Sequence, residues 1–356
     1  MANTKLETVL TQWQNLQPLA EIDRDRLSRR FTIDFNYNSN HIEGNTLTYG
    51  QTELLLLFGK IVGEANFRDC EEMKASNVGL QMMLVESSDK QLPLTQNFIR
   101  TLHRTLLRED YTVYRMLPGG VQTSYVIHAG QYKTRPNSVI TRYGDRFEYA
   151  SPEETPALMA DLVDWYNHAE QEGKLSPIDL AILFHYRYIR IHPFEDGNGR
   201  IARLMVNYIL SRHGYPMIVV RSRLKQDYLE ALHRADLIVG STPADGAHAS
   251  LKDIRPFHKY MVNLICHEIE NDVLFVTEKS KDVWWYDGER IAFRTPSYGK
   301  ILQELRREPK ATLAYLQEEI GINRSALQKL LQTLLDKHYV ERDADGSWRV
   351  FITSSM

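Results

Sequence analysis

The sequence predicts a mainly helical protein with short β-hairpins. Apolar residues recur at helical spacing through most of the chain, as in the stripe formed by Ile201, Leu204 and Ile209. Residues 119–151 and 339–352 instead contain short runs of β-branched and aromatic residues, interrupted by Gly, Asp or Asn. The chain has 356 residues, a length that favours two or three domains.

The composition limits the class of protein. The chain is 43% hydrophobic and 25% charged, which is ordinary for a globular protein with a sizeable core. A net charge of −3 provides no overall positive field for nucleic acid or anionic lipid. Two distant cysteines, Cys70 and Cys266, indicate neither a disulfide framework nor a zinc site. There is no signal-peptide pattern and no apolar run of ~20 residues, so we expect a cytoplasmic protein without a membrane partner.

Residues 1–95 are expected to form an N-terminal helical region. A helix is predicted over residues 5–30. The stretch Asn36–Asn45 contains four asparagines and a serine, which are poor helix formers, so its residues alone favour a polar loop. Thr48 and Gln51 then have the spacing of a capping box ahead of an apolar run, which predicts the start of the next helix.

Residues 96–276 are expected to form one core domain. Within it, Thr134–Thr141 and Arg146–Ala150 flank a turn at Tyr143-Gly144-Asp145, the pattern of a surface hairpin. His103 lies one residue from the apolar stripe of its helix, and we interpret it as structural. Helices are predicted over residues 52–110, 156–169, 177–191, 221–235 and 252–270.

The C-terminal residues predict a small separate domain. Residues 277–297 look like a connector, and residues 298–356 resemble a winged helix-turn-helix. Residues 297–356 contain nine Lys and Arg against eight Asp and Glu, a net charge of about +1. DNA-binding modules usually have a clearly basic face, so we favour protein interaction or dimerisation and keep DNA binding as the alternative. The expected elements are helices at 300–307, 312–320 and 323–336 and strands at 339–342 and 348–352.

The chemistry is concentrated in residues 192–203, which run His-Pro-Phe-Glu-Asp-Gly-Asn-Gly-Arg-Ile-Ala-Arg. The glycines allow backbone N–H groups to point outward, and the start of the following helix adds a partial positive charge. Arg200 and Arg203 supply forked cationic donors suited to phosphate oxygens. His192 can act as a base at cellular pH, and Asp196 can bind Mg²⁺. The stretch therefore predicts a polyphosphate site with a base and a metal ligand at its edge.

The same stretch is similar, at every defined position, to the motif HxFx(D/E)GNGRxxR of the Fic family. The resemblance extends over roughly residues 35–265. Fic enzymes typically transfer AMP from ATP to a hydroxyl side chain of a protein, and the fold is a helical core with a β-hairpin called the flap. The resemblance therefore implies a protein adenylyltransferase that uses ATP and Mg²⁺ and modifies Ser, Thr or Tyr of a target and of itself. Alternatives are a de-AMPylase, a transferase for another nucleotide or phosphate group, and a nucleotide-sensing DNA-binding regulator.

The resemblance also implies a role for each motif residue. His192 would be the general base and Asp196 the Mg²⁺ ligand. Tyr228 falls where relatives often have a tyrosine near the adenine, although packing explains a helical tyrosine equally well. The residues expected to hold the α- and β-phosphates, the leaving pyrophosphate and the γ-phosphate are Gly197, Asn198, Gly199, Arg200 and Arg203.

A second resemblance concerns the polar stretch near the N-terminus. Ser39-x-x-x-Glu43-Gly44 is similar to the inhibitory motif (S/T)xxxE(G/N) of many Fic proteins, in which the glutamate pairs with the second arginine of the phosphate site. Here Glu43 would pair with Arg203 and occupy the position of the γ-phosphate, since a carboxylate suits a guanidinium fork. The resemblance therefore implies an autoinhibited enzyme.

The target protein is expected to dock on the flap, around residues 133–150. In the family this hairpin holds a target segment by strand addition, which depends on main-chain hydrogen bonds. Gly130–Lys133 and Ser151-Pro152 flank the hairpin as they do in relatives, although Lys133 stands where many relatives have arginine. The sequence leaves the target open, and a homo-oligomer is compatible with it.

Overall fold

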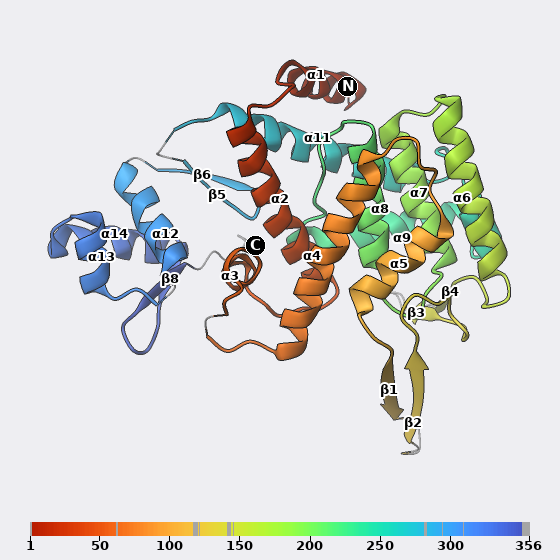
Figure 1. Cartoon of the computed structure of the whole chain (residues 1–356), viewed down its shortest axis with the longest axis horizontal. Helices are drawn as coiled ribbons and strands as arrows, with labels where there is room; N and C mark the ends of the chain where they lie inside the picture. The colour runs from red at the N-terminus through yellow and green to blue at the C-terminus, as the bar shows by residue number, and fades with distance from the viewer. Residues whose placement is uncertain are drawn as a thin grey trace. The chain divides into compact units, whose positions relative to one another are not determined.

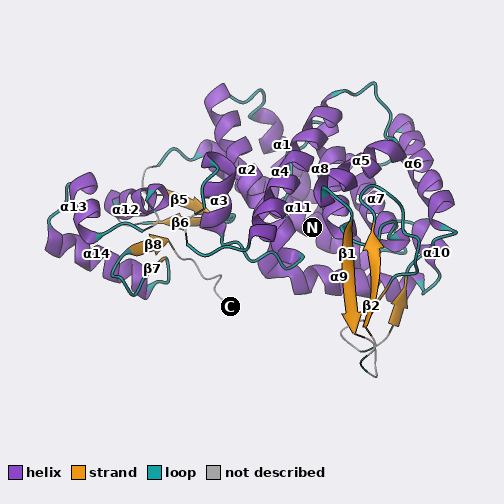
Figure 2. Cartoon of the chain, turned by 60° about the horizontal axis from the view of Figure 1, so that its bottom comes forward, coloured by secondary structure: helices purple, strands orange, loops and turns teal. Residues whose placement is uncertain are grey.

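The computed structural model describes residues 2–61, 63–116, 120, 122–140, 144, 146–280, 283–293, 295–308 and 310–350. The chain forms two compact units. Unit 1 contains Met1–Thr46 and Asn66–Asp272, and unit 2 contains Leu47–Ala65 and Val273–Met356. Most described residues are helical and the described strands form four two-stranded sheets (Figures 1 and 2), so the mainly helical prediction is confirmed.

Unit 1 is built around two adjacent helices, α7 and α8, which are buried on nearly all sides. Helix α7 packs against α6 and α8, and α4 packs against α5 and α8 (Figure 1). No helix among the described residues has the length and apolar character needed to span a membrane. The helices of this unit are α1 (Ala2–Asn15), α2 (Glu21–Ile42), α4 (Phe67–Ser88), α5 (Gln96–Leu107), α6 (Thr155–Glu172), α7 (Pro177–Ile191), α8 (Asn198–Arg212), α9 (Lys225–Val239) and α10 (Pro243–Ala247), and α11 (Arg255–Thr277) continues from unit 1 into unit 2.

Helix α2 continues through residues 36–42 of the asparagine-rich stretch, so the polar loop favoured there is wrong for these residues, and only Glu43, Gly44 and Asn45 lie beyond the helix. Asparagine disfavours helices because its side chain competes for backbone groups. Here the amides of Asn36, Asn38 and Asn40 each donate to the carbonyl four residues earlier, at 2.8 Å, within the helix itself. Tertiary contacts satisfy more of these groups, since Asn38 also accepts from the N–H of Ser222. Burial against neighbouring elements therefore overrides the weak helix propensity.

Unit 1 also contains two hairpins. Strands β3 (Ser138–Ile140) and β4 (Arg146–Glu148) confirm the hairpin predicted for the flap, although both strands are shorter than expected. Tyr143 and Asp145 of the predicted turn lie outside the described residues. Strands β1 (Tyr111–Met116) and β2 (Gln122–Ile127) form a hairpin that the sequence did not predict, and it extends away from the helices of unit 1 (Figures 1 and 2).

Unit 2 contains the predicted winged helix-turn-helix and two further pieces. The expected connector at 277–297 contains a hairpin, whose turn residues Asp287 and Gly288 both have positive φ (45° and 74°), as a tight two-residue turn requires. Helix α3 belongs to this unit, not to an N-terminal region of residues 1–95, and the capping box of Thr48 and Gln51 at its start is confirmed. The elements of unit 2 are α3 (Tyr49–Phe58), β5 (Val283–Tyr286), β6 (Glu289–Ala292), α12 (Pro296–Arg307), α13 (Leu313–Ile320), α14 (Arg324–Asp336), β7 (Val340–Arg342) and β8 (Trp348–Val350).

Candidate active site

The candidate site lies where α7 ends and α8 begins. His192 ends α7 in the left-handed conformation (φ 52°, ψ 59°), and Gly197 opens α8 with φ 77°. The loop between them is closed by Asn198, whose side-chain oxygen accepts from the Phe194 N–H at 3.0 Å and whose amide donates to the Phe194 carbonyl at 2.7 Å. The Asn198 side chain is therefore used to shape the loop. Its backbone N–H, at the helix start, is the group that remains for a phosphate.

His103 supports this loop from α5. Its ring stacks on Phe194, with ring centroids 3.7 Å apart and planes 3° from parallel. The Gly130 N–H donates to Nδ1 at 2.9 Å, so Nδ1 carries the lone pair and Nε2–H donates to the Asp196 carbonyl at 3.0 Å. Burial lowers the pKa of His103 to about 4. His103 is thus a neutral, structural residue, as the sequence suggested.

His192 is held as a neutral ring. It stacks against Tyr149, which follows β4, with centroids 3.9 Å apart. Its Nδ1 lies 3.4 Å from the Ile189 carbonyl oxygen, which can only accept, so Nδ1 carries the proton and Nε2 the lone pair. Burial and the nearby charge of Lys133 lower the pKa of His192 to about 3. At neutral pH the ring can therefore accept a proton.

Lys133 fixes the end of α7 and hence the position of His192. Its side chain is buried, and Nζ donates to the carbonyls of Ile191 (3.1 Å) and His192 (2.9 Å) and to Oδ1 of Asn137 (2.8 Å). Its own N–H donates to the Pro193 carbonyl at 2.9 Å. Burial lowers the pKa of Lys133 to about 7. A cation at the carbonyl end of a helix is favourable, and here it also ties the flap segment to the motif.

Asp196 is an ionised carboxylate at the edge of the site. Its Oδ1 accepts from the Gly197 N–H at 2.7 Å, and its Oδ2 accepts from the Tyr111 hydroxyl at 2.7 Å. Burial acts to raise the pKa of Asp196, but the charge of Arg200 and these two hydrogen bonds outweigh it and lower the pKa overall. The side chain is 40% exposed, which leaves room for a ligand beyond these partners.

The hydrogen-bond donors around the loop suit an anion. Nη2 of Arg200 lies 3.4 Å from Asp196, and its Nε is buried with no partner among the described residues. Position 199 has to be glycine for this arrangement, because the Cβ of any other residue would collide with the Glu43 carboxylate. Asp196 and Arg200 also line a cavity of about 590 Å³, together with Tyr111. A charged phosphate chain fits this combination of donors and space.

Ser39 and Glu43 both contact Arg203. Nε of Arg203 donates to the Ser39 hydroxyl at 3.0 Å, and Nη2 donates to the Ser39 carbonyl at 2.8 Å and to Oε1 of Glu43 at 2.7 Å. Burial acts to raise the pKa of Glu43, but the charge and hydrogen bond of Arg203 lower it overall, so Glu43 is anionic. Gly44 follows with φ 100°, a conformation that favours glycine and ends α2.

Tyr228 lies in the core and is only 2% exposed. Its hydroxyl makes a 2.8 Å hydrogen bond with Nε2 of His185, and its ring packs near Phe257. The structure therefore gives Tyr228 a packing role, and contact with an adenine stays a prediction. Among the described residues there is also no group of three or more His, Cys, Asp or Glu side chains able to hold a metal, which leaves Asp196 as a lone carboxylate candidate.

Comparison with known proteins identifies the family of the chain. The model of the Fic/DOC family matches residues 93–210. A solved Fic domain containing signaling protein from Bacteroides thetaiotaomicron is 52% identical to this chain, with a TM-score of 0.72, and the match covers 78% of this chain and 98% of that one. The chain belongs to the Fic/DOC family.

More distant Fic proteins match a similar part of the chain. The protein adenylyltransferase fic-1 of Caenorhabditis elegans is 29% identical over 287 residues, which are 80% of this chain and 49% of that protein. A solved structure of Fic-1 from the same organism is 25% identical, with a TM-score of 0.59, and covers 76% of this chain and 72% of that one. The chain spans about half the length of the curated relatives it matches. In unit 2, the model of a winged helix-turn-helix DNA-binding domain matches residues 299–341.

Two side chains of this Fic site were not singled out from the sequence. Tyr111, on β1, contacts Asp196 from 85 positions away, and Tyr149 stacks on His192. Neither tyrosine lies in a motif, and their contacts depend on where the ends of the two hairpins meet the helices of the site. The sequence did give a signal that Lys133 matters to the site, because the resemblance placed it where many relatives have arginine. Its contacts with the α7 carbonyls explain why a cation is suited to that position.

Proposed function

We propose that this Fic protein is a protein adenylyltransferase that transfers AMP from ATP to a Ser, Thr or Tyr hydroxyl, and that Glu43 restrains this activity. The observation that carries the proposal is the placement of Glu43 on Arg203, inside a site that also presents the lone pair of His192 and the carboxylate of Asp196. A glutamate in contact with the second motif arginine is expected for a phosphate site that is held closed from within.

His192 would remove the proton of the attacking hydroxyl. In the proposed step the hydroxyl oxygen of the target bonds to the α-phosphorus of ATP, the bond from that phosphorus to the bridging oxygen breaks, and pyrophosphate leaves. The proton passes to Nε2 of His192, whose low pKa keeps the ring neutral before the reaction. Stacking on Tyr149 and the Lys133 contacts with the end of α7 fix the ring for this transfer.

The phosphates would be held by the start of α8 and the two motif arginines. Helical N–H groups at Asn198 and Gly199 suit the α- and β-phosphates, and the buried Nε of Arg200 lacks a partner among the described residues. Mg²⁺ prefers one or two carboxylates together with phosphate oxygens and water, so the ionised, part-exposed Asp196 fits it, and the ion would neutralise phosphate charge. Arg203 would take the γ-phosphate once Glu43 has moved.

The flap would hold the target segment. Strands β3 and β4 pair only with each other among the described strands, so each keeps an outer edge available for main-chain hydrogen bonds. The hairpin is adjacent to the base, because Tyr149 follows β4 directly and stacks on His192. Strand addition at residues 133–150 would therefore bring a target hydroxyl close to the base with little dependence on target sequence.

The test is intact-protein mass spectrometry of Glu43→Gly after incubation with ATP and Mg²⁺. We expect a mass gain of one AMP in this variant, a much slower gain in the wild type, and none in Glu43→Gly with His192→Ala. If the variant does not modify itself, the same three proteins are incubated with cell lysate and ATP labelled on the adenine. Equal labelling by wild type and Glu43→Gly would contradict the restraint, and labelling by the His192→Ala double variant would contradict the base.

The alternative enzyme, a de-AMPylase, is distinguished by the reverse reaction. A protein modified by Glu43→Gly would be purified and returned to the wild type without ATP. Release of AMP by the wild type, but not by Glu43→Gly, would assign Glu43 a part in removing the group. Substitution of GTP, CTP or UTP for ATP in the first experiment tests the choice of nucleotide.

A second candidate function is DNA binding by unit 2. Helix α14 stands third in the winged helix-turn-helix, the position of a DNA-recognition helix, and no carboxylate lies among its exposed residues before Asp336. The near-neutral charge of residues 297–356 still favours a protein-interaction or dimerisation role. A salt-dependent shift of duplex DNA that Lys329→Glu abolishes would favour DNA binding. Concentration-dependent mass in light scattering would favour dimerisation. The exposed residues of α14 are Arg324, Ser325, Gln328, Lys329, Gln332 and Asp336.

A further inference from the structure

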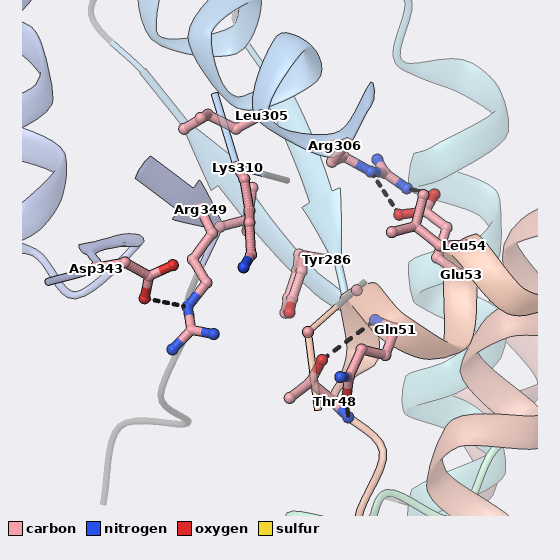
Figure 3. A pocket seen from close by; sticks show the side chains of 13 residues that line it. Thr48, Gln51, Glu53, Leu54, Tyr286, Leu305, Arg306, Lys310, Asp343 and Arg349 are labelled. Atoms are coloured by element: carbon pink, nitrogen blue, oxygen red, sulfur yellow. Dashed lines mark hydrogen bonds and ion pairs between the residues drawn. The ribbon is translucent and has the colours of Figure 1, made fainter. Parts of the chain in front are cut away.

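Unit 2 contains a pocket of about 80 Å³ that α3 shares with the winged helix-turn-helix (Figure 3). Thr48, the N-cap of α3, and Gln51 lie on one side, and the side chains of Tyr286, Lys310 and Arg349 point towards the same space from other elements (Figure 3). The pocket therefore has walls from segments that are far apart in the chain. None of its residues belongs to the site around His192.

The charges of the pocket favour an anion. Two carboxylates line it, and both are already paired. Glu53 accepts from Arg306 at two positions, Nε at 2.8 Å and also Nη2, and Asp343 lies 3.4 Å from Nε of Arg349. Lys310, in contrast, makes no ion pair within 4 Å among the residues that the structure describes, although its charge helps to lower the pKa of the Asp345 carboxyl. An incoming anion would thus meet a cation without displacing a close ion pair.

The uncharged part of the lining favours a flat apolar group beside that anion. The ring of Tyr286 forms one face, and Leu54, Leu305 and Val350 add aliphatic surface. Tyr286 is itself held in place, because its ring lies 4.3 Å from that of Tyr49 and 5.0 Å from that of Trp284. With a volume of about 80 Å³, the pocket admits about one ring, and a small aromatic carboxylate or phosphate combines the charge and the shape that these walls suit.

The segment that carries α3 begins close to the inhibitory glutamate. Glu43 stands at the C-terminal end of α2, and α3 begins at Tyr49. The intervening residues are fixed at two points, since Asn45 donates to the Asp69 carbonyl at 2.9 Å and the Thr46 N–H donates to the Asp69 carboxylate at 2.8 Å. A displacement of α3 would therefore reach Glu43 through a short segment, and the contacts of Asn45 and Thr46 with Asp69 would have to move with it.

We propose that this pocket is an effector site for a small aromatic anion, and that its occupancy strengthens the contact between Glu43 and Arg203. The direction follows from the structure, in which the formed pocket and the engaged Glu43 occur together. A ligand that binds this arrangement shifts the population towards it. The effect on inhibition rests on the proposed function, whereas the binding site does not.

The first experiment measures binding by isothermal titration of the full chain with benzoate, phenyl phosphate and the neutral isostere benzamide. Binding of at least one of the two anions, with benzamide at least about 10-fold weaker, is expected from the positive charge of Lys310. Lys310→Glu should weaken anion binding by about 10-fold or more. Lys337→Glu, at an exposed lysine of the same unit that does not line the pocket, should leave it unchanged. No binding of either anion, or binding that Lys310→Glu does not alter, overturns the site.

The second experiment measures coupling without relying on AMP transfer. The affinity for α,β-methylene-ATP with Mg²⁺ is measured with and without the bound anion, in wild type and in Glu43→Gly. In the wild type the anion should weaken nucleotide binding by roughly 5-fold or more, the range of ordinary allosteric coupling, and in Glu43→Gly it should have no effect. An equal effect in both proteins, or none in either, overturns the coupling. Because the analogue transfers no AMP, the experiment measures the coupling even if the protein proves not to be an adenylyltransferase.

Discussion

Glu43 and Arg203 are 160 positions apart in the chain, yet Oε1 of the glutamate lies 2.7 Å from Nη2 of the arginine. Ser39 precedes Glu43, the C-cap of α2, by one helical turn, so both residues reach the same guanidinium. The helix therefore accounts for the spacing of the Ser39-x-x-x-Glu43 motif. A γ-phosphate that pairs with Arg203 has to replace at least the carboxylate.

The first prediction concerns these two contacts and nucleotide affinity. Glu43→Gln removes the negative charge opposite Arg203 but leaves an amide oxygen that can still accept from Nη2, so it removes only part of a contact worth about 1.5–3 kcal/mol and should tighten binding of α,β-methylene-ATP by up to about 10-fold. Ser39→Ala removes a neutral hydroxyl that accepts from Nε of Arg203, and should tighten binding only a few-fold. Titration calorimetry with Mg²⁺ present gives both affinities. A Ser39→Ala effect larger than that of Glu43→Gln would show that the carboxylate is not the main restraint.

Much of the fold could be predicted from the sequence because its signals are local. Apolar spacing located most helices, including α7 at Pro177–Ile191, and the capping box of Thr48 located the start of α3. The motif placed a base, a carboxylate and two arginines in one loop and helix start, where they also lie in space. These features depend on neighbours within a few residues, which a sequence displays directly.

The errors involve contacts that a sequence does not display. The Asn36–Asn45 stretch looked like a loop, but its amides bond to carbonyls one turn earlier once the helix is buried. Strand β1 begins soon after α5. That helix ends at Arg108 with φ 67°, a conformation that a sequence usually indicates by a glycine, and no glycine is present here. The membership of α3 in unit 2 depends on its pairing of Glu53 with Arg306, 253 positions away.

The second prediction tests whether Tyr111 positions Asp196 for a metal. Tyr111→Phe removes the hydroxyl that donates to Oδ2 at 2.7 Å and leaves the ring. Groups that orient a metal ligand commonly contribute a factor of 10–100 in metal affinity, so the Mg²⁺ concentration for half-maximal labelling should rise by about 10-fold. The measurement uses Glu43→Gly as the parent protein, with saturating ATP. Tyr114→Phe is the matched control, since Tyr114 lies on the same strand and is 68% exposed. An unchanged Mg²⁺ requirement in Tyr111→Phe would remove Tyr111 from the site.

The third prediction concerns a buried ionic network that joins α2 to α11. Arg221 pairs with Asp34 of α2 at 2.8 Å and with Glu268 of α11 at 2.6 Å. Asp272, one helical turn after Glu268, lies 3.6 Å from Nη1 of Arg30. Burial raises the pKa of Asp272 from 3.8 to about 7, and the negative charges of Glu268 and Asp34 act in the same direction against the attraction of Arg30. The network thus contains a carboxyl that resists ionisation.

Asp272 should therefore make the protein less stable as the pH rises. Between pH 4 and pH 7 the folded state binds more protons at Asp272 than the unfolded state does, so the free energy of unfolding falls over this interval and the loss is complete above it. Asp272→Asn keeps the neutral form at every pH. Its advantage over the wild type should widen between pH 5 and pH 8, by on the order of 2 kcal/mol, since each unit of pKa shift corresponds to about 1.4 kcal/mol. Urea unfolding at the two pH values measures this difference.

The control for this prediction is a carboxyl whose pKa is shifted in the opposite direction. Hydrogen bonds from the hydroxyl and the N–H of Ser250 lower the pKa of Asp253, ahead of α11. An acid with a lowered pKa stabilises the folded state above its unfolded pKa, so Asp253→Asn should be less stable than the wild type at pH 8 and regain part of that difference as the solution is acidified below pH 4. If Asp272→Asn instead kept a constant offset from the wild type between pH 5 and pH 8, Asp272 would titrate as an ordinary carboxyl. The ionic network would then hold α2 to α11 with all of its carboxylates charged.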